Sequence, residues 1–244
     1  EETGYHPDLD LLPSLITSNT RLIILNSPEN PCGSNLSHAE LEKIANIVRQ
    51  HQNLYIMSDE IYKDILYTDS HNSIAAMQGM SEKTIILDGF SKSYAMTGWR
   101  LGYGICPEEL VPHITRLAVN SVSCAASFSQ MAAIAALDGP QDDVNAMANE
   151  FSQRRRLITD GLRSIPGIRC PEPEGAFYAF PSISETGLSS HDFEERALSE
   201  AGVALLSGSA FGEYGEGYVR LSYANSQENI QIALENISKF VQSL

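Results

Sequence analysis

Three short apolar runs, each followed at once by polar residues, constrain the fold of this chain more than any other feature. The runs occupy residues 22–25, 54–57 and 84–87, and they end in Asn26-Ser27, Ser58-Asp59 and Asp88-Gly89. A run that is apolar at every position is typical of a strand covered by helices on both faces, as in a parallel sheet. We therefore expect three parallel strands.

A helix is predicted between the first two strands. Ser37 and Glu40 have the spacing of a capping box, and an apolar face follows at helical spacing, made of Leu41, Ile44, Ala45 and Val48. Strand, helix and strand then alternate, which defines the α/β class.

Polar residues follow each predicted strand. Ligands of open α/β sheets bind beyond the carboxyl ends of the strands. Asn30, Asp59 and Lys92 all come after such ends. We therefore expect these three side chains to converge on one pocket.

The second half of the chain reads as helices followed by another α/β unit. Helices are expected at residues 124–137 and 142–165, then strands at 176–180, 203–206 and 218–223, with a helix at 191–201 and a last helix capped by Ser226. We place a domain boundary at Gly139-Pro140. Residues 1–140 then form the remaining part of a large sheet domain, and residues 141–244 a small C-terminal α/β domain.

Charge and cysteine content exclude several classes of function. A net charge of −15 argues against nucleic acid and anionic membrane surfaces as partners. The apolar runs are too short to span a bilayer. The four cysteines and six histidines have no metal-ligand or disulfide spacing. We expect a cytoplasmic protein without a metal site.

Four segments, in order along the chain, resemble one known family. Residues 88–103 (DGFSKSYAMTGWRLGY) resemble the cofactor-lysine motif of class I/II aminotransferases, which are pyridoxal-phosphate enzymes of fold type I. Residues 26–33 (NSPENPCG), 58–62 (SDEIY) and 218–224 (YVRLSYA) match other motifs of that family. The resemblance runs from about Arg21 to the C-terminus. It implies the sheet domain of the aspartate aminotransferase-like superfamily and a smaller C-terminal domain.

The resemblance makes Lys92 the catalytic residue, which holds pyridoxal 5'-phosphate as a Schiff base. That bond needs a neutral amine, and a partly desolvated lysine beside another cation loses its proton more readily. The amine, once released by substrate, can move a proton between substrate and cofactor. Without the surrounding motif, Lys92 would read as a surface lysine.

Three further residues resemble cofactor ligands of the family. Asp59 is expected to bind the pyridine nitrogen and keep the ring protonated, so that the ring accepts electrons. Tyr62 and Asn30 are expected to hydrogen-bond the phenolic oxygen, and Asn30 also counts among the substrate-binding residues. Alternatives stay open: a helix cap for Asp59, a turn before Pro31 for Asn30, and packing for Tyr62.

Arginines are expected to bind the anionic groups. The resemblance makes Arg100 a phosphate ligand, with Ser91 adding a hydroxyl or a backbone N–H. Many relatives carry a hydroxyl three residues before the lysine, where this chain has Gly89. Arg220, in the middle of a predicted strand, is expected to bind the substrate's α-carboxylate bidentately. Its alternative is a salt bridge to an acidic neighbour.

The resemblance also implies that this chain is N-terminally truncated. Relatives carry a phosphate-binding turn, a ring-stacking aromatic residue and further strands, and nothing before Arg21 resembles these. We expect an unpaired sheet edge, an exposed apolar face and weak cofactor binding by this chain alone.

Three functions are compatible with these residues. The first is an aminotransferase, active as a homodimer, that moves an α-amino group between an amino acid and a 2-oxo acid. The second is a carbon–sulfur β-lyase on the same scaffold. The third is a non-catalytic fragment or effector-sensing domain. The identity of the amino donor does not follow from the sequence.

Overall fold

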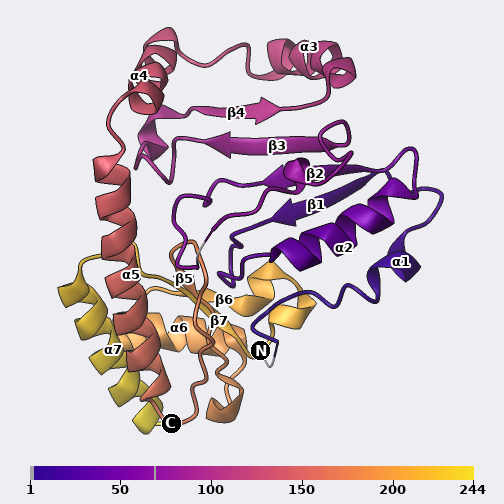
Figure 1. Ribbon diagram of the computed structural model, residues 1–244. Helices are drawn as coiled ribbons and strands as arrows, with labels where there is room; N and C mark the ends of the chain where they lie inside the picture. The colour runs from indigo at the N-terminus through magenta and orange to yellow at the C-terminus, as the bar shows by residue number, and fades with distance from the viewer. Residues whose placement is uncertain (1–2, 69) are drawn as a thin grey trace. The chain divides into compact units, whose positions relative to one another are not determined.

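The chain forms two compact units in the computed structural model, which describes residues 3–68 and 70–244 (Figure 1). The large-sheet unit comprises residues 6–28 and 35–145. The C-terminal unit comprises residues 146–244, residues 29–34 and the stretch up to Tyr5. The domain boundary at residue 140 stays a prediction.

The large-sheet unit contains a four-stranded sheet. Its strands are β1 (Leu22–Asn26), β2 (Tyr55–Asp59), β3 (Thr84–Gly89) and β4 (Gly102–Ile105), in that order across the sheet. The first three are parallel, as the apolar runs predicted. β4 pairs antiparallel with β3. It was not predicted, because its sequence, Gly-Tyr-Gly-Ile, contains no apolar run.

Helix α2 (His38–Arg49) confirms the prediction made from the capping box. Ser37 Oγ accepts the Glu40 N–H, and the Glu40 carboxylate accepts the Ser37 N–H at 2.8 Å. Leu41, Ile44, Ala45 and Val48 are buried in one core with Ile56 of β2. The shorter elements are α1 (Leu12–Leu15), η1 (Ile74–Ala76), η2 (Thr97–Trp99) and η3 (Glu108–Leu110).

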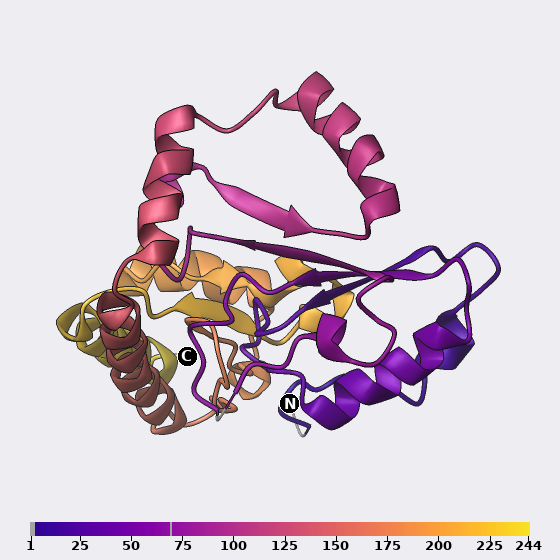
Figure 2. The same ribbon diagram turned by 45° about the horizontal axis from the view of Figure 1, so that its top comes forward.

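The other face of this sheet is not covered as the apolar runs suggested. Ile24 and Leu87 are exposed, and all four residues of β4 are exposed. Figure 2 shows α3 (Val111–Ser121) and α4 (Ser127–Asp138) on the side of the sheet away from α2. No residue of α3 is buried. The expected exposed apolar face is therefore present, and α3 carries exposed residues along its whole length.

The C-terminal unit packs helices around a small antiparallel sheet. The strands β5 (Tyr178–Ala179), β6 (Leu206–Ser207) and β7 (Val219–Ser222) lie in the order β5-β7-β6 and are shorter than predicted. Its other elements are α5 (Asp142–Arg163, entering from the large-sheet unit), η4 (Ser184–Thr186), α6 (Ser190–Ala201), η5 (Gly208–Phe211), η6 (Glu213–Gly215) and α7 (Gln227–Gln242). The rings of Phe193 and Phe240, 5.3 Å apart, join α6 to α7. Within the described ranges, no helix is both long and apolar enough to cross a membrane.

Candidate functional site

The segment after β3 holds Lys92 in a compact turn. Phe90 and Ser93 are buried on either side of Lys92. The Ala95 N–H donates to the Lys92 carbonyl oxygen at 3.1 Å, and the Met96 N–H donates to the Phe90 carbonyl oxygen at 3.2 Å. Because its neighbours anchor the turn, the half-buried Lys92 has a defined position.

Lys92, Tyr62 and Asp59 lie together at the carboxyl ends of β2 and β3. The Lys92 Nζ is 5.7 Å from the centroid of the buried Tyr62 ring. Burial raises the pKa of the Asp59 carboxyl; Asp88 and Glu60 add to this, whereas the Ile61 N–H and the charge of Lys92 lower it. Two of the three residues expected to converge, Asp59 and Lys92, are therefore neighbours.

Asp59 is a half-buried carboxylate at the end of β2. Its Oδ1 accepts the Ile61 N–H at 3.3 Å, so it also stabilises the turn that follows β2. Among residues 3–68 and 70–244, no cationic side chain forms an ion pair with it. Burying a carboxylate without a cation is unfavourable, so the position suits a cationic group of a ligand.

We expect Asp59→Asn to stabilise the cofactor-free protein near neutral pH. The folded-state pKa of Asp59 is raised, so the folded protein binds this proton more tightly than the unfolded chain does. The stabilisation that results is fully present below the unfolded-state pKa and is lost as the pH rises through the folded-state pKa. Asn removes that loss and still accepts the Ile61 N–H. Urea unfolding at pH 7 and at pH 4 measures this: the gain from Asn should shrink at the lower pH. An equal gain at both values would contradict it.

Asp88, which the sequence analysis did not assign, joins the elements around this cluster. Its Oδ1 accepts the Gly89 N–H at 2.7 Å, and its Oδ2 accepts the Tyr103 hydroxyl at 2.6 Å and pairs with Lys63. Burial and the bond to Asp88 raise the pKa of Tyr103 to about 12. The side chain of Asp88 thus links β3, β4 and the turn after β2. Its position at a strand end was visible in the sequence, but its partners depend on β4.

Arg100 and Ser91, the two expected phosphate ligands, lie on the segment around Lys92. Arg100 is exposed, follows η2 in the left-handed conformation (φ 53°), and donates from Nη1 to the Thr97 carbonyl oxygen at 3.1 Å. Ser91 is half-buried before Lys92. An exposed guanidinium can bind phosphate, but the phosphate role of both residues stays a prediction.

The structure explains why position 89, three residues before Lys92, is a glycine. Gly89 lies opposite Gly102 in the pairing of β3 with β4. A Cβ at position 89 would lie 2.8 Å from the Gly102 Cα and 3.1 Å from the Leu101 carbonyl oxygen. A residue with a hydroxyl-bearing side chain does not fit there without separating the strands.

Arg220 is the centre of a second cluster, in the C-terminal unit. Its Cζ lies 4.5 Å from the centroid of the Tyr178 ring and 4.8 Å from that of Phe211. Its Nη1 donates to the Asn30 Oδ1 at 2.7 Å. No acidic side chain in the described part of the chain pairs with it, so the salt bridge considered as an alternative is absent there. The guanidinium keeps donors for another acceptor.

Gly33 fixes the turn that carries Asn30. Its φ is +76°, its carbonyl oxygen accepts the N–H groups of Glu174 and Gly175, and an added Cβ would lie 2.7 Å from the Pro173 Cβ. We expect Gly33→Ala to lower the free energy of unfolding by about 2 kcal/mol, from both backbone strain and the clash.

Gly187→Ala is the matched control for that variant. Its φ is +77°, but nothing lies within 4 Å of an added Cβ. Chemical unfolding of both variants separates the cost of backbone strain from the cost of the clash with Pro173. Equal losses would show that the contact with Pro173 adds nothing.

Known proteins match this chain in sequence and in fold. The family described as aminotransferase class I and II matches residues 1–237. The chain belongs to this family, whose members depend on pyridoxal phosphate.

Particular relatives differ in the substrates they are named for. Aspartate aminotransferase of Pyrococcus horikoshii is 41% identical over 99% of this chain and 62% of its own length. A probable N-acetyl-LL-diaminopimelate aminotransferase of Bacillus subtilis is 40% identical over 98% of this chain and 60% of its own length. The crystal structure of an aromatic aminotransferase from P. horikoshii matches with a TM-score of 0.95 and 41% identity, over 99% of this chain and 65% of that one. The chain spans about three-fifths of the length of the curated relatives it matches.

Proposed function

We propose that this chain acts in an aminotransferase that moves an α-amino group between an amino acid and a 2-oxo acid. The observation that carries the proposal is the cluster of Lys92, Tyr62 and Asp59 at the ends of neighbouring parallel strands. It brings an amine, an aromatic hydroxyl and a carboxylate together at the edge of the sheet where ligands of such folds bind. The aminotransferase names of its relatives support the same reaction.

The residues present fit pyridoxal phosphate. Asp59, a half-buried carboxylate without an ion-pair partner in the described ranges, suits a protonated pyridine nitrogen. Lys92 supplies the amine for covalent attachment, Tyr62 and Asn30 supply polar groups for the phenolic oxygen, and Arg100 with Ser91 holds the phosphate. When bound, the cofactor supplies an electron sink for the pair left by loss of the Cα proton.

In this proposal, side chains of this chain move the proton and bind the substrate. Lys92, once its amine is released, takes the proton from the substrate Cα and returns it at the acceptor carbon. Asp59 stays ionised because the pyridinium charge offsets the burial that raises its pKa in the cofactor-free protein. Arg220 binds the α-carboxylate, and the aromatic rings beside it restrict its motion.

We also propose a homodimer in a reducing, cytoplasmic setting. All four cysteines are unpaired in the structure, as expected where thiols stay reduced. Amino acids and 2-oxo acids are the proposed substrates. The different substrate names among the relatives make aspartate, aromatic amino acids and N-acetyl-LL-diaminopimelate the first candidates to test.

A donor panel tests this function. The protein is incubated with pyridoxal phosphate, 2-oxoglutarate and one amino acid at a time, and the new 2-oxo acid and glutamate are quantified. Equal amounts of both products support amino transfer. Release of pyruvate and ammonia without glutamate, from a donor with a β-leaving group, would replace the proposal with the β-lyase.

A further inference from the structure

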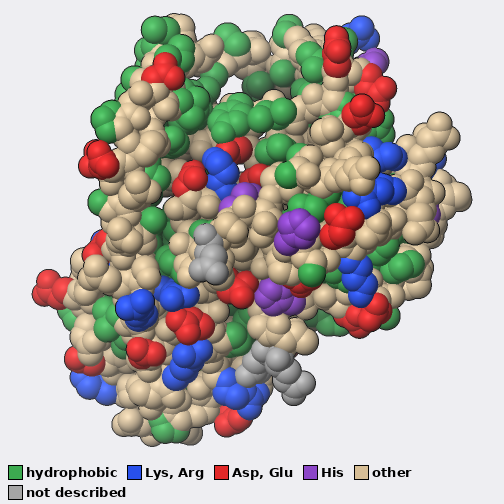
Figure 3. Space-filling view, in the orientation of Figure 1, with side chains coloured by type: hydrophobic (Ala, Val, Ile, Leu, Met, Phe, Trp, Pro, Cys, Tyr) green, Lys and Arg blue, Asp and Glu red, His purple; other side chains and the backbone are tan. Residues whose placement is uncertain are grey.

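A second carboxylate, that of Glu60, is buried directly after Asp59, and the sequence analysis assigned it no role. Figure 3 shows acidic and basic side chains next to one another on the surface of the protein. Glu60, by contrast, is only 4% exposed. Burying a carboxylate is unfavourable unless hydrogen bonds or a cation compensate for the lost water. The groups that hold Glu60 therefore show what this position requires.

Three side chains hold the Glu60 carboxylate. The Ser58 hydroxyl donates to its Oε1 at 2.9 Å, and the Ser73 hydroxyl donates to the same oxygen at 2.7 Å. The His71 Nε2 lies 3.0 Å from its Oε2. Burial raises the pKa of the Glu60 carboxyl, but the hydrogen bonds from His71, Ser73 and Ser58 outweigh burial and hold this pKa below its ordinary value. Glu60 is therefore an anion near neutral pH.

The main chain and side chain of Glu60 fix the turn that follows Asp59. The Glu60 N–H donates to the Leu87 carbonyl oxygen of β3 at 2.9 Å, and the Glu60 carbonyl oxygen accepts the Lys63 N–H at 2.9 Å. The bonds to the carboxylate tie the same turn to residues 71–73. The end of β2, where Asp59 lies, is therefore attached both to the next strand and to the segment after the turn.

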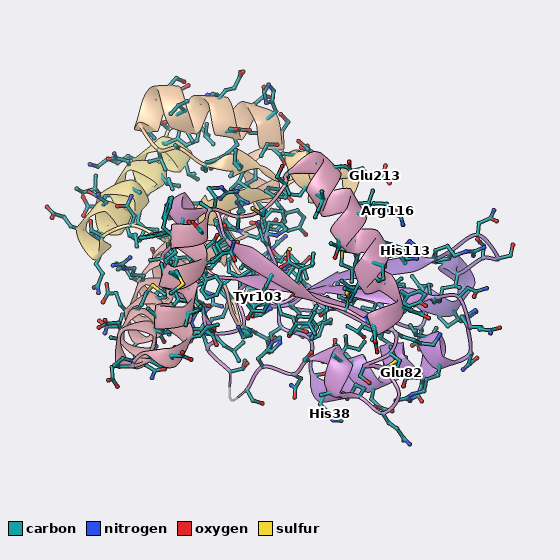
Figure 4. All side chains as sticks on the ribbon, turned by 90° about the horizontal axis from the view of Figure 1, so that it is seen from above. His38, Glu82, Tyr103, His113, Arg116 and Glu213 are labelled. Carbon is teal, nitrogen blue, oxygen red and sulfur yellow. The ribbon has the colours of Figure 1, made fainter. Side chains whose placement is uncertain are left out.

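The negative charge of Glu60 acts on Asp59. Burial is the largest cause of the raised pKa of Asp59, and the charges of Asp88 and Glu60 add to it. Asp88 is balanced, because it pairs with Lys63 and accepts the hydroxyl of Tyr103, which Figure 4 places on β4. Two of the three donors to Glu60 are uncharged hydroxyls, and the third, an imidazole, is cationic only when protonated. Glu60 thus adds negative charge beside Asp59.

We propose that Glu60 is a positioning residue that acts on the ligand through Asp59. It fixes the turn after β2 and adds a second negative charge beside the carboxylate proposed to bind the ring nitrogen of the cofactor. Nearby negative charge favours the protonated form of a nitrogen over the neutral form. The inference rests on the proposed function for the identity of the ligand. Glu60 needs no contact of its own with that ligand.

Titration of the cofactor-free protein, followed by carbon NMR of labelled Asp and Glu carboxyl groups, tests the effect of the charge. Glu60→Gln should lower the pKa of Asp59 by roughly 0.5 or more, because a like charge is removed. Glu60→Asp keeps the charge and should restore most of that difference. Glu82→Gln is the control, because Glu82 is exposed and precedes the amino end of β3 (Figure 4), whereas Asp59 lies at the carboxyl end of β2.

Two results of this titration overturn the proposal. One is an unchanged pKa of Asp59 in folded Glu60→Gln. The other is an equal decrease in Glu60→Asp, because the shape of the side chain and not its charge would then be the cause. The wild-type protein gives a measurement that needs no variant: Glu60 should lose its proton at a lower pH than Asp59. The reverse order also overturns the proposal, because Glu60 would be neutral while Asp59 ionises.

Two probes test the effect on the ligand. Pyridoxal phosphate, and its analogue with a CH group in place of the ring nitrogen, are each titrated into the wild-type protein and Glu60→Gln, and binding is followed by absorbance. Glu60→Gln should lower the affinity for pyridoxal phosphate roughly threefold or more. The affinity for the analogue should not change, because the analogue cannot take up a proton at that position.

Equal losses with both probes overturn the proposal, because they would show that Glu60 only supports the fold. Failure of the wild-type protein to bind pyridoxal phosphate would instead reject the proposed function. The titration of Asp59 in the cofactor-free protein then still decides whether Glu60 acts on Asp59, so the two failures are distinguishable.

Discussion

Replacing Lys92 by Ala is expected to abolish covalent attachment of pyridoxal phosphate and to lower amino transfer by roughly 10³-fold or more. The amine has two proposed tasks, holding the cofactor and moving the proton, and Ala performs neither. Lys92 lies in the turn between the buried Phe90 and Ser93, and its Nζ is 5.7 Å from the Tyr62 ring centroid. This position places the amine where the proposed cofactor binds. Borohydride reduction with the cofactor, followed by peptide mass analysis, measures the attachment.

Lys43→Ala is the control for this prediction. Lys43 pairs with Asp10 at 2.6 Å at the surface of the same unit, so its loss should change neither attachment nor rate. A small primary amine in the buffer should restore part of the activity of Lys92→Ala by carrying the proton. Attachment at another lysine with normal turnover in Lys92→Ala would reject the assignment.

The parts of the fold that follow from local sequence were predictable. The capping box at Ser37 and Glu40 and the four apolar positions after it predicted α2, which begins directly after Ser37 and ends one residue after Val48. The apolar runs predicted β1, β2 and β3, because consecutive apolar positions are typical of strands in a parallel sheet. Asp59 and Lys92 follow directly from those strand ends.

The parts that depend on non-local contacts were not predictable. β4 has two glycines and no apolar run, and it forms because Gly89 and Gly102 allow a close approach of the two strands. The network of Asp88, Lys63 and Tyr103 in turn depends on β4. The apolar runs also predicted that both faces of the sheet are covered, whereas Ile24 and Leu87 are exposed on one face.

The surroundings of Arg220 illustrate the same limit. Alternation along the strand indicated a half-buried arginine but left two partners open, a substrate carboxylate or an acidic neighbour. The structure places its guanidinium against the rings of Tyr178 and Phe211, with Asn30 as its hydrogen-bond acceptor, and the substrate carboxylate stays a prediction. Those partners come from distant parts of the sequence, and the contact with Asn30 requires the turn fixed by Gly33.

Replacing Arg220 by Ala is expected to lower kcat/KM for amino acids by about 100-fold or more, mostly through KM. Removing one partner of a buried, hydrogen-bonded charge pair typically costs about 2–5 kcal/mol. Arg220→Lys should recover only part of the loss, because an ammonium keeps the charge but lacks the planar fork that binds both carboxylate oxygens. Steady-state kinetics with a single amino donor, at several concentrations, separate KM from kcat.

Two comparisons distinguish carboxylate binding from a structural role of this residue. Arg196 also lies against a ring, 5.3 Å from the centroid of Phe240, but it is already paired with Glu200; Arg196→Ala should therefore leave KM unchanged. The second comparison uses a primary amine that lacks the carboxylate of the donor. If Arg220 acts on the carboxylate, the wild-type protein and Arg220→Ala should react with that amine at similar rates. A loss as large as that for the amino acid would mean that Arg220 supports the fold around Tyr178 and Phe211 and does not bind substrate.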